Sequence, residues 1–321
     1  MISRDPDELF AAARSGSRTA LARLLTYAES GGENQRATAA RAYRGELPYV
    51  VGLTGAPGAG KSTLTDRLIG ETLARGPFVT AAGDTTAVAV LCVDPSSPFS
   101  GGAILGDRIR MQEHAMNEAV FIRSLATRGH LGGLSLAVPD ALRVLGAVGF
   151  PVVLVETVGV GQMEVDIASA ADSTVVVMNP GWGDAMQASK AGLLEVADVF
   201  VINKADRPGV RETRRDLEQM LDLGANAGWR PMVVETVAST GAGTSELYDA
   251  IAAHRRHLEA EGLAAARRER VRAELDKVLA SVLRSRVVDL ARGTAYEEQV
   301  DALVAGETDP YRAAENLLAM P

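Results

Sequence analysis

The sequence predicts an α/β fold: a mainly parallel β-sheet flanked by helices, with helical extensions at both ends of the chain. Two observations lead to this prediction. Between about residues 48 and 255, short apolar runs alternate with longer segments of helical periodicity, and such alternation is typical of a parallel sheet covered on both faces. Polar and glycine-rich motifs also follow several of the apolar runs, at the strand ends where such sheets bind ligands.

Residues 1–46 are predicted to be helical. Apolar residues recur at helical spacing in residues 7–14 and 18–27, and Ser30-Gly-Gly-Glu-Asn34 indicates a break between helices. The segment carries no recognisable chemistry. We therefore expect it to pack beside the central domain or to contact a partner.

Seven strands are expected from the apolar runs. They are Tyr49–Thr54, Val88–Val93, Val120–Arg123, Val152–Glu156, Thr174–Asn179, Val199–Asn203 and Met232–Glu235. The only cysteine, Cys92, lies in the second run and is expected to be a small buried residue rather than part of a disulfide. Residues 76–86 indicate a flexible connection before that run.

The composition changes after about residue 255. Residues 263–304 are rich in Ala, Arg, Glu and Leu, and five apolar residues there form a helical stripe: Val271, Leu275, Val278, Leu279 and Val282. Asp309-Pro310 begins a further short helix. We divide the chain into an N-terminal helical extension (1–46), a central domain (47–255) and a C-terminal helical arm (256–321). From the residues alone, this arm fits dimerisation and folding back onto its own domain equally well.

Charge and hydropathy exclude several classes of partner. The formal net charge is −8, the sequence pI is about 5.2 and aromatic residues make up 4% of the chain, which argues against nucleic acid as a partner. The acidic first residues lack the apolar core of a signal peptide, and no apolar run is long enough to span a bilayer. We expect a soluble, cytoplasmic protein that has no membrane partner.

The stretch Gly55-Ala-Pro-Gly-Ala-Gly-Lys-Ser62 matches the phosphate-binding pattern G-x-x-x-x-G-K-[ST] between a predicted strand and a predicted helix. Its glycines allow a tight turn that directs N–H groups inward, and the helix N-terminus favours anions. Lys61 can reach the β- and γ-phosphates, and the Ser62 hydroxyl can ligate Mg²⁺. The pattern predicts a nucleoside triphosphate site formed by Gly55, Ala56, Pro57, Gly58, Ala59, Gly60, Lys61, Ser62 and Thr63.

Carboxylates follow two later strands. Asp94 can hold Mg²⁺ through water or position the attacking water, although Asp94-Pro95 is also a turn signal. Glu156 ends a very apolar strand, where such enzymes keep their Mg²⁺-linked acid, and the Gly159 amide is placed to meet a γ-phosphate. Because Glu is longer than the usual Asp, we favour a link through water. Asp107 is a further metal candidate whose alternative role is a helix N-cap.

Asn203-Lys204-Ala205-Asp206 follows another buried strand and indicates guanine specificity. Asp206 can accept hydrogen bonds from the N1–H and 2-amino groups of guanine, and adenine offers neither donor in that geometry. The backbone of Ala238, in a later strand-end segment, is a candidate to close over the base. The expected ligands are therefore GTP and GDP with Mg²⁺.

The segment Asn179–Lys190, which carries Trp182, is interpreted as a mobile element that contacts a partner or the nucleotide, with a plain loop as the alternative.

Together these motifs resemble the MeaB/ArgK family of P-loop GTPases, whose members accompany adenosylcobalamin-dependent methylmalonyl-CoA mutase. The most specific pieces are Asp94-Pro-Ser-Ser, Leu105-Gly-Asp-Arg-Ile-Arg-Met, Arg128-Gly-His-Leu-Gly-Gly, Glu156-Thr-Val-Gly-Val-Gly-Gln, Asn179-Pro-Gly-Trp-Gly-Asp, Asn203-Lys-Ala-Asp and Asp309-Pro-Tyr-Arg-Ala-Ala. Two departures from the family are the long segment 76–86 and Val237, which replaces the usual Ser of the base-closing loop.

The resemblance implies a homodimeric GTPase that binds the mutase, gates cofactor loading and protects the mutase from inactivation. It assigns Ser62, Asp94, Asp107 and Glu156 to the Mg²⁺ neighbourhood. It also makes the segment Asn179–Lys190 a switch, in which Asp184, Gln187 and Lys190 couple mutase contact to hydrolysis. The implied catalytic set is Lys61, Asp94, Glu156, Asp184, Gln187 and Lys190. Apart from this implied set, no obvious Gln that positions the attacking water and no arginine finger stand out, so we expect slow intrinsic turnover and a mutase that supplies or orders the missing group.

Three other functions fit the same nucleotide core. A transport-linked kinase needs an acceptor pocket and usually an Arg-rich lid, and neither is evident. A GTPase metallochaperone for nickel would need clustered His or Cys ligands, and we interpret His254 and His257 as part of a solvated helix face. The third is a scaffold that binds GTP without hydrolysing it. The presence of three carboxylates argues against this function: Asp94, Asp107 and Glu156.

Overall fold

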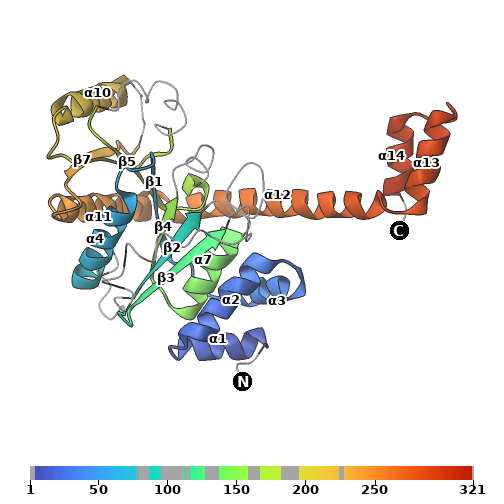
Figure 1. Ribbon diagram of the computed structural model, residues 1–321, viewed down its shortest axis with the longest axis horizontal. Helices are drawn as coiled ribbons and strands as arrows, with labels where there is room; N and C mark the ends of the chain where they lie inside the picture. Colours follow the sequence, from blue (N-terminus) through green and yellow to red (C-terminus); the bar gives the residue numbers. More distant parts are fainter. Residues whose placement is uncertain are drawn as a thin grey trace. The chain divides into compact units, whose positions relative to one another are not determined.

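A seven-stranded, all-parallel sheet with the strand order β3-β2-β4-β1-β5-β6-β7 forms the centre of residues 1–267 (Figure 1). The computed structural model describes residues 4–76, 78, 87–94, 111, 114, 116–126, 137–157, 167–181, 195–223 and 228–319. The chain divides into two compact units, Met1–Arg267 and Arg268–Pro321, and each is described by itself.

All seven predicted strands are present, and the predicted fold class is confirmed. The strands are β1 (Tyr49–Gly55), β2 (Val88–Asp94), β3 (Val120–Ala126), β4 (Val152–Thr157), β5 (Ser173–Met178), β6 (Val199–Asn203) and β7 (Met232–Thr236). Their apolar runs are nearly continuous because both faces of the sheet are covered. Cys92 is fully buried in β2, as expected.

Helices cover both faces of the sheet. In the first unit they are α1 (Pro6–Arg14), α2 (Arg18–Ser30), α3 (Gly32–Ala42), α4 (Lys61–Arg75), α7 (Ala137–Val148), α10 (Val210–Leu223) and α11 (Thr244–Glu261), together with the short 3-10 helix η1 (Ile167–Ser169). Along β1, Val51 and Leu53 pack in a cluster with side chains of α4 and α11, whereas Val50 packs with side chains of α1, α2 and α7. The N-terminal helices therefore extend the core on one face, which is the first of the two alternatives expected from the sequence.

A buried polar cluster attaches α11 to the N-terminal ends of β1, β5 and β6. Ser173 Oγ lies 2.6 Å from Tyr49 Oη and 2.6 Å from His254 Nδ1. His254 Nε2 lies 3.3 Å from Asp198 Oδ1. The Trp229 ring covers the cluster, with its centroid 4.9 Å from that of His254. Each of these polar side chains therefore has a partner, as buried polar groups require.

The expectation that His254 lies on a solvated helix face is wrong, because this side chain is only 2% exposed. Burial is the main factor that lowers the pKa of His254, to about 4, and the nearby His257 is the next. His257 is half-buried. Among the residues that the structure describes, no group of three or more His, Cys, Asp or Glu side chains could hold a metal ion.

The first turns of helix α12 (Leu263–Leu290) are tied to the same edge of the sheet. Arg267 Nε and Nη2 donate to the two carboxylate oxygens of Asp172, at 3.1 and 2.9 Å, and Nη2 also donates to the Pro48 carbonyl at 3.1 Å. The Val50 N–H donates to Asp172 Oδ2 at 2.9 Å. This bidentate pair joins the helix to the starts of β1 and β5.

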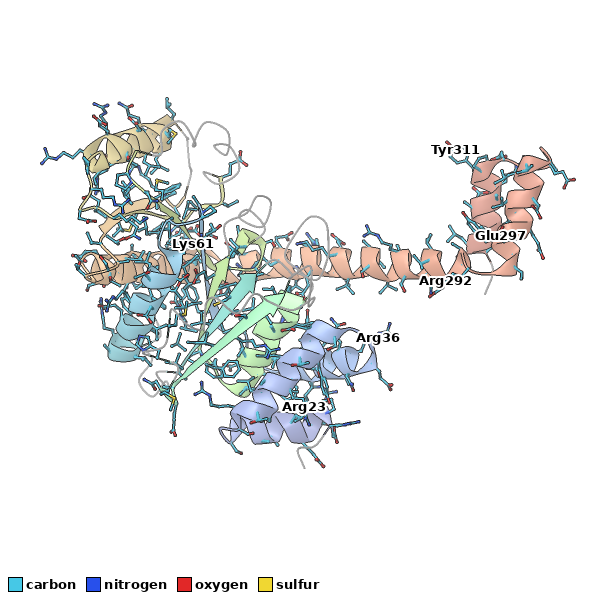
Figure 2. The ribbon with its side chains drawn as sticks, in the orientation of Figure 1. Arg23, Arg36, Lys61, Arg292, Glu297 and Tyr311 are labelled. Carbon is cyan, nitrogen blue, oxygen red and sulfur yellow. The ribbon has the colours of Figure 1, made fainter. Side chains whose placement is uncertain are left out.

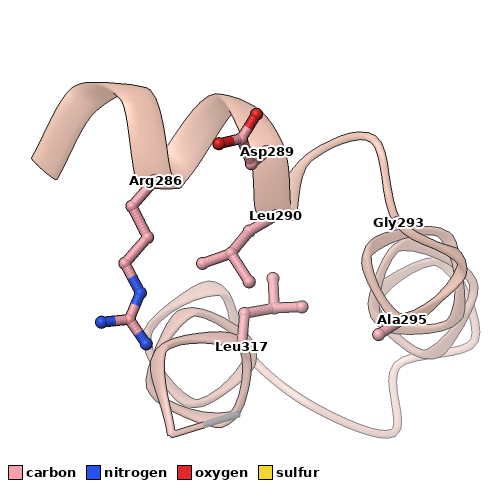
Figure 3. A pocket seen from close by; sticks show the side chains of 6 residues that line it. All are labelled: Arg286, Asp289, Leu290, Gly293, Ala295 and Leu317. Carbon is pink, nitrogen blue, oxygen red and sulfur yellow. The ribbon is translucent and has the colours of Figure 1, made fainter. Parts of the chain in front are cut away.

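The second unit contains the rest of α12, α13 (Thr294–Val304) and α14 (Pro310–Leu318). Asp309 caps α14 by accepting from the N–H groups of Tyr311 and Arg312. All five residues of the predicted apolar stripe are on α12, and their exposed fractions run from 39% (Val271) to 64% (Leu275). The three helices surround a hollow in which Leu290 and Leu317 face each other (Figure 3). No helix in the described part of the chain is long and apolar enough to cross a membrane.

We predict that His254 makes the protein less stable as the pH falls from about 6.5 to about 4. In this range the unfolded chain binds a proton at His254 and the folded chain does not, so the free energy of unfolding falls by up to about 1.4 kcal/mol per pH unit. Urea unfolding at several pH values in this range measures the slope. His254→Gln does not titrate and should show a shallower slope. Equal slopes for the two proteins would contradict the prediction.

Candidate nucleotide-binding site

The predicted phosphate-binding loop lies between β1 and α4, at the carboxyl ends of the strands (Figure 2). At two positions of this loop only glycine fits, because the backbone is left-handed there and neighbouring atoms leave no room for a Cβ. A Cβ on Gly55 (φ +133°) would overlap the Val177 carbonyl oxygen on β5, and a Cβ on Gly60 (φ +94°) would overlap Asn203 Nδ2. The loop can therefore pack directly against the neighbouring strand ends.

Two lysine ammonium groups bind the backbone of this loop. Lys61, at the first position of α4, donates from Nζ to the carbonyl oxygens of Gly55 at 2.6 Å and Ala56 at 3.0 Å, and it is only 6% exposed. Lys204 donates from Nζ to the Gly58 carbonyl at 2.6 Å. Lys204 has a φ of +59°, an uncommon conformation for a residue other than Gly. Both cations therefore lie against the phosphate-binding loop.

Glu156 is buried beside the start of α4. Its Oε1 accepts a hydrogen bond from Ser62 Oγ at 2.5 Å, and the Thr65 hydroxyl lies 3.2 Å from its Oε2. The strand register places Glu156 opposite Leu53 of β1 and Cys92 of β2, in the middle of the sheet. A charge buried in such a position requires polar partners, and the hydroxyls of α4 supply them.

The Asn203 side chain connects the phosphate-binding loop to the end of β7. Its Nδ2 donates to the Ala59 carbonyl at 2.7 Å. Its Oδ1 accepts from Thr236 Oγ1 at 3.0 Å and from the Ala238 N–H at 3.1 Å. Asn203 is 2% exposed, so these bonds are protected from water.

Asp206 lies in a turn directly after β6. The turn is held by hydrogen bonds from the Ala205 N–H to the Thr236 carbonyl at 2.9 Å and from the Arg207 N–H to the Lys204 carbonyl at 3.0 Å. The Asp206 side chain is exposed. A fixed turn with an exposed carboxylate next to the phosphate-binding loop suits recognition of a base.

The structure thus brings together Lys61, Ser62, Glu156, Asn203, Lys204 and Ala238. The backbone of Asp94 ends β2, but its side chain lies outside the description, as do Asp107, Gly159, Asp184, Gln187 and Lys190. Thr65 was not among the predicted site residues. Thr65 comes three residues after Ser62 and therefore lies on the same face of the helix. This spacing is the one feature of the sequence from which Thr65 could have been predicted.

Chemically, the arrangement suits a polyphosphate with a bound cation. Two ammonium groups and the N-terminus of α4 favour an anion at the loop. The Ser62 hydroxyl donates a hydrogen bond to Glu156 and keeps its oxygen lone pairs available. That oxygen and the nearby carboxylate are hard ligands of the kind Mg²⁺ prefers.

Comparisons with known proteins identify relatives that are named as GTPases. A family model described as "Methylmalonyl Co-A mutase-associated GTPase MeaB" matches residues 21–292. A putative GTPase of Pyrococcus abyssi is 46% identical over 319 residues, 97% of this chain and 95% of that protein. The GTPase ArgK of Escherichia coli is 38% identical over 78% of this chain and 76% of its own length. The crystal structure of a LAO/AO transport system kinase matches 99% of this chain and 97% of its own, with 28% identity and a TM-score of 0.69.

We predict that Asn203→Ala lowers the free energy of unfolding by about 2–3 kcal/mol, because it leaves three buried partners of the amide unpaired. Urea unfolding without nucleotide measures this effect separately from ligand binding. Asn316→Ala removes an exposed amide and should change stability by less than about 0.5 kcal/mol. A loss no larger at Asn203 than at Asn316 would show that the Asn203 contacts do not hold the site together.

Proposed function

Since the chain belongs to the MeaB family of methylmalonyl-CoA mutase-associated GTPases, we propose that it binds GTP with Mg²⁺, hydrolyses GTP to GDP and phosphate, and serves an adenosylcobalamin-dependent methylmalonyl-CoA mutase as a chaperone. In this role it gates cofactor loading and protects the mutase from inactivation. One observation carries the nucleotide part: Asn203 joins the phosphate-binding loop to the segments that would hold guanine. The mutase part rests on the family description.

Lys61 is proposed to bind the β- and γ-phosphates. Its ammonium group is already buried and meets two carbonyl dipoles of its own loop. Most of the desolvation free energy of this ammonium group is therefore already spent when the protein folds, before a nucleotide binds. Phosphate oxygens carry full charge and would replace these carbonyls as stronger partners. The same lysine would then stabilise negative charge that develops as water attacks the γ-phosphate.

Ser62 is proposed as a direct Mg²⁺ ligand, and Glu156 as a carboxylate linked to the ion through water. Both carboxylate oxygens of Glu156 already lie within hydrogen-bond distance of hydroxyls, which favours this indirect role. A Mg²⁺ ion held by these two residues would supply positive charge that offsets the charge of the phosphates. Asp94, Asp107 and Gly159 remain proposed members of the same neighbourhood.

Guanine is proposed to lie between the Lys204 side chain and the segment that begins at Ala238, with Asp206 accepting from its N1–H and 2-amino groups. The turn after β6 fixes the backbone of Asp206 beside the phosphate-binding loop. Adenine has no matching donors at these positions, so the carboxylate would reject it.

We also propose that the protein is a homodimer and that Asp184, Gln187 and Lys190 relay mutase contact to the hydrolytic site. The exposed apolar stripe of α12 supports the dimer, because apolar side chains such as Leu275 and Leu279 gain from being covered. A metallochaperone is less well supported. His254, one of the two clustered histidines, is buried and bound to Ser173.

We predict that Asp206→Asn exchanges the guanine preference for a xanthine preference. The amide offers one acceptor and one donor, which match the N1–H and the 2-oxo group of xanthine. Affinities for GDP and XDP, measured by calorimetry, should each change by at least about tenfold in opposite directions. Asp216→Asn removes the same charge from the exposed surface of α10 and should change neither affinity. Unchanged GDP binding in Asp206→Asn would exclude Asp206 from base recognition.

The complete proposal is tested by measuring GTP hydrolysis with and without an adenosylcobalamin-dependent methylmalonyl-CoA mutase. We predict slow hydrolysis by the protein alone, clear acceleration when the mutase is added, and no comparable effect with ATP. Guanine-specific hydrolysis that the mutase does not change would retain the GTPase and reject this partner. Transfer of the phosphoryl group to an acceptor other than water would favour the kinase alternative.

A further inference from the structure

Arg67 connects helix α4 to the loop that follows β7. Its Nε donates to the Ala238 carbonyl oxygen at 3.1 Å, and its Nη2 donates to the Ser239 carbonyl oxygen at 3.1 Å. The planar guanidinium fork suits two consecutive carbonyls, a geometry that a lysine does not reproduce. Because α4 begins with Lys61 and Ser62, this contact joins the phosphate end of the site to the proposed base end.

The loop after β7 is closed by its own backbone hydrogen bonds. Its internal hydrogen bonds run from the Val237 N–H to the Ala242 carbonyl at 2.9 Å and from the Gly241 N–H to the Val237 carbonyl at 3.0 Å. Ala238 is held from both sides, since its N–H donates to Asn203 and its carbonyl accepts from Arg67. Asn203 and Arg67 together therefore set how this loop faces the site.

The Arg67 contact also determines where one backbone donor points. The Ala238 carbonyl and the Ser239 N–H belong to one planar peptide group and point in opposite directions. When Arg67 holds the carbonyl towards α4, the Ser239 N–H is directed away from α4. Within the described part of the chain, this N–H has no hydrogen-bond partner, whereas the Ala238 N–H is already engaged by Asn203.

We propose that Arg67 is a positioning residue for base recognition: it orients the peptide between Ala238 and Ser239 so that the Ser239 N–H donates to the 6-oxo group of guanine. This inference rests on the proposed function, because it requires guanine to bind beside Asp206. It adds a contact at the other end of the Watson–Crick edge of the base from the 2-amino group that Asp206 would bind. Adenine presents a 6-amino donor at this position and would face the N–H with another donor.

The test replaces Arg67 by Met, which has similar length and no donor, in the full chain. Affinities are measured for GDP, for IDP, which lacks the 2-amino group, and for 6-thio-GDP, in which sulfur replaces the 6-oxo oxygen. We expect Arg67→Met to weaken GDP binding about tenfold, equivalent to about 1.4 kcal/mol. In the wild type, 6-thio-GDP and IDP should each bind more weakly than GDP, and we call each difference in affinity a penalty. In Arg67→Met the penalty for 6-thio-GDP should largely disappear. The penalty for IDP should remain, because it comes from the missing contact between the 2-amino group and Asp206.

Arg75→Met is the matched control on the same helix. Arg75 forms an ion pair with Asp249 and donates to Ser245 on α11, so its loss should leave both penalties unchanged. Arg67→Lys should lie between the wild type and Arg67→Met. Wild-type GDP affinity in Arg67→Met, or equal weakening of all three nucleotides, would overturn the inference. A wild-type protein that binds ADP as well as GDP would instead overturn the proposed function.

Discussion

The buried amide of Asn203 holds together three segments that lie far apart in the sequence. It donates to Ala59 in the phosphate-binding loop and accepts from Thr236, the last residue of β7, and from Ala238. A parallel sheet brings β1, β6 and β7 to one edge, but it does not connect the loops beyond that edge. An amide side chain can do so because it carries a donor and an acceptor on one rigid plane. Gly60 completes the arrangement, since a side chain there would displace Asn203.

The charges of the site are held in place by neutral partners of the same chain. Lys61 meets backbone carbonyls, and Glu156 meets the hydroxyls of Ser62 and Thr65. Neither buried charge depends on a ligand for its hydrogen bonds, so the site can remain assembled between nucleotides. An incoming phosphate chain would exchange these weaker partners for stronger ones, and this exchange gives nucleotide binding a direct way to alter α4 and β4.

Local sequence signals were enough to predict the sheet and the phosphate-binding loop. The apolar runs are rich in valine, and the loop pattern fixes residue types at every required position. Contacts between distant segments left no such signal. His254 stands beside Arg255 and Arg256, so its surroundings in sequence look polar, yet Ser173 and Trp229 enclose it. Arg67 looks like any charged residue on a helix surface, and its two carbonyl partners lie more than 170 positions later.

The central claim is that guanine nucleotide binds across the loop at 55–63 and the turn at 203–206. A crystal structure of the protein with Mg²⁺ and a non-hydrolysable GTP analogue tests it most directly. Our account predicts that Lys61 Nζ leaves the Gly55 and Ala56 carbonyls for phosphate oxygens, that Asn203 keeps its bond to Ala59, and that Asp206 contacts the base. A nucleotide bound elsewhere, or one bound while Lys61 still contacts Gly55, would contradict it.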